Sequence, residues 1–235
     1  MNETVECSET EMNLRVTLDW RTTLATVVLL PTLLFLGFWQ LDRADEKVDL
    51  IARMEERRVL PPITLLQVQQ LRVEELADRQ LAMSATFTDG QYVLLDNRLR
   101  SGRFGYEVVA FAEAEGFMVP LNLGWIKGDA SRQTLPEVSL PVGTHALTGR
   151  LYQPSSAAFM LGANPFPAIL PGVVQQLSFA DWARDLEAQF AQPIFGFEVR
   201  VGEFESAAFV ADWATVNQTP AKHQGYAVQW FTMAA

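Results

Sequence analysis

The longest apolar stretch of the chain covers residues 22–41 and contains no charged side chain. As a helix it rises about 1.5 Å per residue and spans about 30 Å, the thickness of a bilayer's hydrocarbon core. Trp20 and Trp39 lie at its two ends, where interfacial aromatic residues gather. Neither a buried soluble helix nor the shorter apolar run of a signal peptide fits this length. The pattern predicts a transmembrane helix over residues 22–41, preceded by an acidic segment over residues 1–21.

The segment that follows the apolar stretch is charged but has a helical pattern. Residues 44–60 carry a narrow apolar strip, and Pro61-Pro62 is expected to end the helix. A solvated helix that continues the membrane span is the simplest interpretation. Residues 65–76 predict a second short helix or a loop.

After residue 80 the pattern changes to short runs of β-branched and aromatic residues. Residues 81–88 and 92–97 flank Asp89-Gly90, a tight-turn signal, and predict a β-hairpin. Residues 106–112 and 117–127 flank the segment Glu113–Gly116 and predict a second hairpin.

Further short strands are predicted at residues 145–151, 173–177, 195–201 and 209–213. Between them, Ser178 is a candidate helix cap and Pro193 ends the helix. The apolar face of this helix would be formed by Phe179, Trp182, Ala183, Leu186 and Phe190.

These elements predict an α+β fold that is mainly β. An N-terminal transmembrane helix would precede a small antiparallel β-barrel or sandwich with one or two short helices, over residues 42–222. Residues 223–235 follow this domain.

Composition and charge exclude several classes of protein. The formal net charge is -10, from 18 basic and 28 acidic residues, which argues against a nucleic-acid partner because such binding needs clustered cations. The hydrophobic share of 49% excludes an intrinsically disordered chain. The single cysteine, Cys7, and the two histidines, His145 and His223, leave no internal disulfide and no His-rich metal centre.

The sequence shows little sign of catalytic chemistry. Glu107, Glu113 and Glu115 lie near a predicted hairpin, where paired carboxylates could share acid and base roles, but such residues are usually plain solvated charges. No Gly-x-Ser-x-Gly motif and no nucleotide-binding glycine loop is found. We expect that the protein is not an enzyme.

Several short sequence motifs, here called phrases, occur along the chain in an order typical of one family. The first is Gly37-Phe-Trp39-Gln40-Leu-Asp-Arg43 with Lys47, and the last is His223-Gln-Gly225-Tyr226-Ala227-Val-Gln229-Trp230-Phe231. Between them lie Asp89-Gly90, Asn97-Arg98, Gly102, Gly105-Tyr106, Val119 to Trp125, and Leu147 to Leu151. Together they resemble the signatures of the Surf/Shy family of cytochrome c oxidase biogenesis factors.

The resemblance implies a membrane-anchored biogenesis factor for haem-copper cytochrome c oxidase, which assists haem a insertion or subunit I maturation. Its expected partners are oxidase subunit I or its assembly intermediates, and membrane lipid. In the family the last phrase opens a second transmembrane helix that continues further, so the resemblance implies that residues 223–235 begin such a helix and that the chain is trimmed within it. A permanent structural accessory subunit of a respiratory complex, without haem binding, is the alternative; an anchored solute-binding or wall-binding module is a third.

The expected site lies where the two spans leave the membrane. His223 is the candidate metal ligand, since a neutral imidazole can bind haem iron through Nε2, and the resemblance implies that the haem is haem a. Trp39, Gln40 and Arg43 at the end of the first span are expected to pack with Tyr226 and Trp230 into a juxtamembrane cleft. Tyr226, Gln229 and Trp230 share one helix face and are candidate contacts of the cofactor. Interfacial anchoring is the alternative role of the aromatic residues, and a lone histidine is more often a polar group at a boundary.

Two features disagree with the family pattern. Leu123 stands where the family strand has arginine, and Lys127 and Arg132 are candidates to compensate. Five cations follow the first span within about twenty residues, against two before it, so the positive-inside rule places the main domain in the cytoplasm. The family layout instead places it in the periplasm of a bacterial inner membrane, or in the intermembrane space if the membrane is mitochondrial. We follow the family layout.

Overall fold

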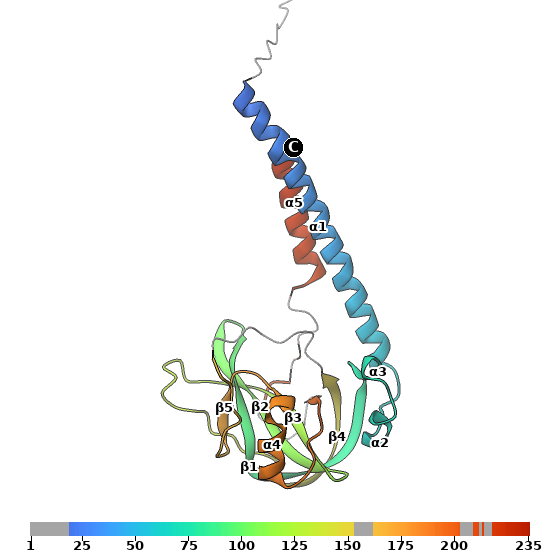
Figure 1. The fold of residues 1–235 in the computed structure, drawn as a ribbon, viewed down its shortest axis with the longest axis vertical. Coiled ribbons are helices and arrows are strands. Elements are labelled where there is room, and N and C mark those ends of the chain that lie inside the picture. Colours follow the sequence, from blue (N-terminus) through green and yellow to red (C-terminus); the bar gives the residue numbers. More distant parts are fainter. Residues whose placement is uncertain (1–18, 153–161, 203–208, 212, 214–217) are drawn as a thin grey trace, which may run out of the picture. The chain divides into compact units, whose positions relative to one another are not determined.

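The computed structural model describes residues 19–152, 162–202, 209–211, 213 and 218–235. The chain forms two compact units, one of residues 1–49 with 216–235 and one of residues 50–215. The predicted fold class is confirmed, because a long apolar N-terminal helix precedes a six-stranded sheet with short helices (Figure 1).

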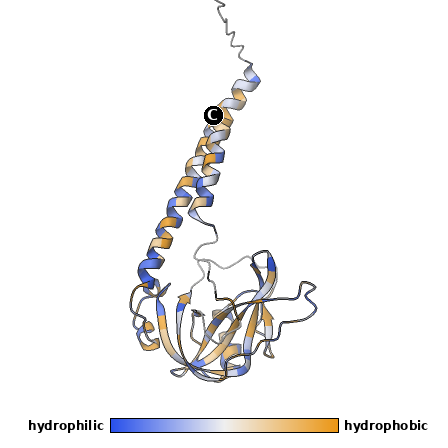
Figure 2. Cartoon of the chain, turned by 180° about the vertical axis from the view of Figure 1, so that it is seen from behind, coloured by the Kyte–Doolittle hydropathy of each residue, from blue (hydrophilic) through white to orange (hydrophobic). Residues whose placement is uncertain are grey.

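The first helix, α1 (Trp20–Arg58), runs without interruption through the predicted anchor and the charged segment after it. In the described part of the chain it is the one helix long and apolar enough to span a membrane, and hardly any of its most apolar stretch is buried. The hydroxyls of Thr26 and Thr32 donate to the carbonyls of Thr22 and Val28, at 2.9 and 2.8 Å. These bonds satisfy the polar groups within the helix, which makes the stretch compatible with hydrocarbon. Figure 2 shows the hydrophilic C-terminal end of α1.

The second unit is a small closed barrel. Sheet neighbours follow the order β2-β3-β6-β4-β1-β5, and β2 also pairs with β1, so the sheet closes on itself. The sheet is mixed, not purely antiparallel, because β3–β6 and β1–β5 are parallel. The strands are β1 (Gln80–Arg100), β2 (Arg103–Ala114), β3 (Phe117–Lys127), β4 (Gly143–Tyr152), β5 (Gly172–Val174) and β6 (Glu198–Val201).

Two apolar cores share the strands of this barrel. Leu94 belongs to the core inside the barrel, whereas its neighbours Val93 and Leu95 belong to a second core with Trp182 and Leu186 of α4 (Phe179–Phe190). Successive side chains on a strand point to opposite faces, so an uninterrupted apolar run is expected where both faces are covered. The helix α4 therefore closes one outer face of the barrel.

The hairpin predicted at Asp89-Gly90 is wrong. Both flanking runs belong to the single strand β1, whose first part pairs with β4 and whose later part pairs with β5, while β2 pairs along both. The register against β2 shifts between Phe87 and Tyr92, and Gly90 has a φ of 75°. An Asp-Gly pair supplies the positive φ of a bulge as readily as that of a turn. The turn into β2 lies at Ser101-Gly102, where both φ values are positive.

The second predicted hairpin is confirmed. β2 and β3 meet at Glu115-Gly116, whose φ values of 50° and 83° suit a two-residue turn. The strand predicted at residues 145–151 is β4, while those at 173–177 and 195–201 are the shorter strands β5 and β6. In the last predicted strand, Val210 forms an isolated antiparallel bridge to Trp125, and Asp212 lies outside the described residues.

The short helices largely follow their predictions. Residues 65–76 form two single-turn helices, α2 (Leu65–Val68) and α3 (Val73–Leu76). Thr64 caps α2 by accepting a hydrogen bond from the backbone of Gln67. In α4 the side chain of Ser178 makes no capping bond, and Ala183 is exposed although it was predicted to share the apolar face.

Candidate functional site

The candidate site lies on α5 (Pro220–Ala234), which belongs to the same unit as most of α1. Thr219 is the N-cap residue in an extended conformation, and Pro220 occupies the first turn, where a missing N–H costs nothing. His223 follows within the first turn and is only 8% exposed, and Ala227, one turn later, is buried as well. The buried face of α5 therefore starts with His223.

His223 is held by a side chain of α1. Its Nδ1 lies 2.8 Å from Oε1 of Gln40, 183 positions earlier in the chain. An amide oxygen only accepts hydrogen bonds, so Nδ1 is the donor, and in the neutral form of such a ring the lone pair lies on Nε2. No described residue forms a hydrogen bond with Nε2. Nε2 is therefore the ring atom that could ligate a metal.

The two helices touch again at Gly37. A Cβ atom there would lie 2.4 Å from the ring of Phe231, closer than real contacts allow. Phe231 also packs edge-to-face on Phe38, with ring centroids 5.2 Å apart. The small residues Gly37 and Ala44 are the buried positions of α1, so α5 packs alongside α1 where no large side chain intervenes (Figure 1).

Replacement of Gly37 by leucine is expected to separate α1 from α5, because its side chain needs the space of the Phe231 ring. The expected result is a longer and broader distance distribution between spin labels at Val28 and Val228, two exposed positions of this unit. The measurement is double electron–electron resonance on full-length protein in which Cys7 is changed to serine.

Gly225 provides the matched control, because a Cβ atom at this helical glycine meets nothing within 4 Å. Gly225→Leu gains the same helix propensity without the clash, and we expect it to leave the distances unchanged. Equal distributions in the Gly37→Leu and Gly225→Leu proteins would show that the contact with Phe231 does not hold the helices together.

The other predicted site residues lie around this pair without joining it. Trp39 is 45% and Tyr226 is 40% exposed. Gln229 is exposed as well, while Trp230 and Arg43 are half-buried, and Arg43 forms an ion pair with Glu46. Among the described residues, no hydrogen bond, ion pair or ring contact links Trp39 or Arg43 to Tyr226 or Trp230. The structure brings together Gln40 and His223, and the juxtamembrane cleft stays a prediction.

The site offers one histidine, and kinds of metal centre differ in how many protein ligands they need. No group of three or more His, Cys, Asp or Glu side chains that could hold a metal is found among the described residues. A structural zinc ion needs about four protein ligands, whereas a haem iron receives four nitrogens from its porphyrin and one or two axial ligands from protein. One histidine with a free Nε2 is enough for the second case only.

Among the described residues of the barrel, no cation takes the place of the family arginine. Leu123 is 1% exposed and belongs to the core inside the barrel, at a bulge of β3. Lys127 is exposed, and Arg132 pairs with Asp96 and lies over the ring of Phe104. No described interaction brings either cation to Leu123, so the apolar side chain simply fills its place in the core.

Comparisons with known proteins agree with these features. The profile of the SURF1 family matches residues 27–235. A SURF1-like protein of Dictyostelium discoideum is 32% identical over 107 residues, which are 41% of this chain and 40% of the relative. A SURF1-like protein of Rickettsia felis is 29% identical over 108 residues, 45% of this chain and 46% of the relative. The matched parts span less than half of these curated relatives, but the family profile covers nearly the whole chain. This chain belongs to the SURF1 family.

Proposed function

We propose that this chain is a membrane-anchored biogenesis factor for haem-copper cytochrome c oxidase, which assists haem a insertion or subunit I maturation. Family membership and the apolar helix α1 support the general role. Its partners would be oxidase subunit I or its assembly intermediates, and the surrounding lipid. It would act by binding and not as an enzyme.

The observation that carries the haem part of this proposal is the bond from His223 to Gln40. Histidines that ligate a metal almost always donate their other ring N–H to an acceptor, which fixes the tautomer and the ring orientation. Gln40 supplies this acceptor from a different helix. Haem a would be cargo held for a short time, with His223 as its protein ligand; Tyr226, Gln229, Trp230, Trp39 and Arg43 are proposed to contact the macrocycle.

The proposed location is the bacterial inner membrane, with the barrel in the periplasm, or the mitochondrial inner membrane in a eukaryote. The family layout supports this side, although the cations after the span favour the other one. The cations at the C-terminal end of α1 already have local partners. Arg57 donates to the carbonyls of Ala77 and Glu74, and Arg58 pairs with Glu55. Two of the five cations counted after the span therefore also take part in contacts within the folded protein.

A second candidate function is a permanent accessory subunit that never binds haem. One observation favours it: the bond between His223 and Gln40 ties α1 to α5 and satisfies two polar groups, which is a sufficient structural use of both. Such a subunit would co-purify in equal amounts with the mature oxidase and would carry no haem of its own.

Deletion of the gene tests the assembly role. We expect reduced-minus-oxidised spectra of membranes to lose most of the a-type haem signal, together with oxidase activity. The b-type and c-type signals serve as internal controls and should persist. An unchanged a-type signal with unchanged oxidase activity would remove the assembly role.

A further inference from the structure

The outer face of the barrel carries a row of charged side chains that the proposed function does not use. Arg150 on β4 lies directly opposite Arg200 on β6, and Arg200 is in turn the partner of Asn122 on β3. Outer faces of small barrels are usually open to water. Here the side chains of Arg150 and Arg200 are only 22% and 14% exposed, so two like charges are held together in a sheltered place.

Holding two arginines at opposite positions has a cost, because like charges directly across a ladder repel each other. Burial lowers the pKa of Arg150 below its ordinary value, and the charge of Arg200 lowers it further, while Asp78 acts in the opposite direction. Asp78 lies 3.4 Å from Arg150, and Glu198 lies 2.9 Å from Arg200. One carboxylate per guanidinium offsets the charge, but neither lies between the two arginines in the strand register.

Arg200 is fixed in orientation by its neighbours. Its Nε donates to Glu198, and its guanidinium carbon lies 3.3 Å from the ring centre of Tyr152 and 4.9 Å from that of Trp213. No described residue accepts a hydrogen bond from its two terminal nitrogens. The Nε bond and the two ring contacts hold the guanidinium of Arg200 in place. Its two terminal nitrogens, the fork of the side chain, can then donate to a ligand that binds beside them.

The support extends deeper into the barrel wall. The amide of Asn122, which is fully buried, donates to Glu198 at 2.8 Å and to Glu107 at 2.9 Å. Glu107 in turn faces Arg98 at 3.7 Å. Glu198, which orients Arg200, is therefore itself oriented by Asn122. Proteins commonly use such supporting hydrogen bonds to fix the side chains that bind ligands.

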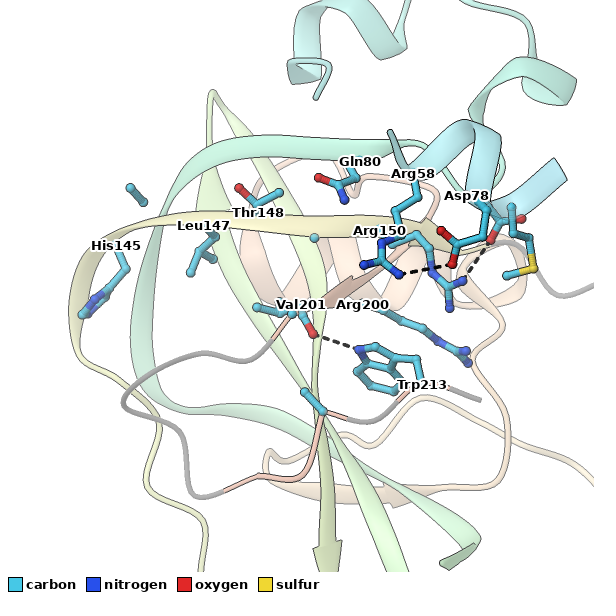
Figure 3. Close-up of a pocket in the computed structure, with 16 residues that line it drawn as sticks. Arg58, Asp78, Gln80, His145, Leu147, Thr148, Arg150, Arg200, Val201 and Trp213 are labelled. Atoms are coloured by element: carbon cyan, nitrogen blue, oxygen red, sulfur yellow. Dashed lines mark hydrogen bonds and ion pairs between the residues drawn. The ribbon is translucent and has the colours of Figure 1, made fainter. Parts of the chain in front are cut away.

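A groove opens beside this pair. Its volume is about 1080 Å³, and Figure 3 shows Arg150 with Asp78, and Trp213 near Arg200, along its wall. The indole N–H of Trp213 donates to the carbonyl of Val201 at 2.9 Å, which fixes the ring. The remaining wall is mixed in character, with Gln80, Thr148 and Ala146 among its members. The space is sufficient for a small molecule.

We propose that the Arg150–Arg200 pair binds an oxyanion, a carboxylate or a phosphate, carried by a small molecule whose apolar or aromatic body lies against Trp213. An oxyanion between the two guanidinium groups relieves their repulsion and accepts charge-assisted hydrogen bonds from the fork of Arg200. The site lies within the barrel unit and does not depend on haem binding by His223.

The test uses the full chain in nanodiscs of phosphatidylcholine, with three fluorescent probes of the same ring system: 2-naphthyl phosphate, 2-naphthoate and neutral 2-naphthol. We expect at least one of the two anions to bind at least about tenfold more tightly than 2-naphthol, with an affinity that falls as salt rises. Which anion binds better identifies the preferred oxyanion. Equal binding of all three probes would overturn the proposal.

Variants assign the binding to the pair. Arg150→Gln and Arg200→Gln are each expected to weaken the anionic probe by at least about tenfold, the usual effect of losing a charge-assisted hydrogen bond. Arg58→Gln is the control at the rim of the groove, since Arg58 is 69% exposed and paired with Glu55, and we expect less than a twofold change. Arg200→Lys keeps a positive charge near Glu198, so the protein is expected to fold, but it lacks the two terminal guanidinium nitrogens. This variant therefore tests whether the guanidinium geometry, and not charge alone, binds the probe.

Two outcomes with these variants contradict the proposal: unchanged binding in Arg150→Gln and Arg200→Lys, or an equal loss in Arg58→Gln. Competition then identifies the source of the anion. Displacement by inorganic phosphate supports a free small anion, whereas displacement only by short-chain dihexanoyl phosphatidylglycerol supports a lipid headgroup. Displacement by neither of these phosphates nor by acetate at millimolar concentration would also overturn the site.

Discussion

Alanine at position 223 is expected to remove haem binding while the barrel remains folded. In the proposed site His223 would supply the protein's nitrogen ligand to the iron, and a substitute is not expected because the chain has two histidines and one cysteine in all. His223 belongs to the helical unit and the barrel core to the other, so the substitution leaves the barrel's packing intact. The measurement is the Soret spectrum of purified full-length protein after loading with haem, with near-UV circular dichroism as the fold check.

The partner of His223 provides a sharper version of this experiment. Gln40→Leu keeps the approximate volume of the side chain but removes the acceptor for Nδ1–H, and loss of such a partner typically costs 10–100-fold in metal affinity. We therefore expect weakened, not abolished, haem binding in this variant. In His223→Gly, added imidazole should restore the spectrum, because a free imidazole can enter the space left by the side chain.

His145→Ala is the matched control. This residue lies on β4 in the barrel unit, where its Nε2 is 3.1 Å from the carbonyl of Val142. We expect its loss to leave haem binding unchanged. Equal haem occupancy and an identical Soret position in the wild-type and His223→Ala proteins would refute the ligand role and leave the accessory-subunit alternative ahead.

The parts of the fold that were predicted correctly depend on local pattern. The uncharged stretch predicted α1, and the β2–β3 hairpin followed from two apolar runs around a glycine turn. Both signals are short in range. The first depends on length without charge, and the second on a turn that returns the chain on itself.

Strand β1 shows where local pattern fails. Asp89-Gly90 interrupts an apolar run in the same way whether the chain reverses or merely bulges, since both need a positive φ. The difference is decided by partners far away: β4 pairs with the first part of β1, and β5 with the later part. The local sequence around Asp89-Gly90 does not indicate which distant strands pair with β1.

The contacts within the candidate site could not be foreseen from the sequence, for a similar reason. Gln40 and His223 were both proposed from their phrases, yet their bond joins positions 183 apart and follows only from the packing of two helices. Gly37 and Phe231 also lie in those phrases, but their close approach, which leaves no room for a Cβ atom at position 37, is visible only in three dimensions. The pair Arg150 and Arg200 was missed altogether, because like charges on separate strands carry no signal until the register places them opposite each other.

Arginines in place of both Leu33 and Leu34 are expected to release the protein from the membrane. Each cation at mid-span costs about 2.5–3.5 kcal/mol on insertion scales, so the pair costs about 5–7 kcal/mol. The substitutions fall in the apolar part of α1, where Leu34 is 37% exposed and has no described polar partner that could compensate a charge. The measurement is the fraction that stays in the membrane pellet after a carbonate wash.

The control for this experiment is a variant with two arginine substitutions outside the membrane span. Leu66 in α2 is 64% and Val73 in α3 is 47% exposed, so arginine at both positions leaves the apolar part of α1 untouched. We expect this second double variant to stay in the pellet like the wild type. If the Leu33/Leu34 variant also stays there, α1 is not the sole anchor, and α5 or a membrane-bound partner must hold the chain. Removal of α5 from that variant would then distinguish the two, because release on its removal assigns the residual anchoring to this helix.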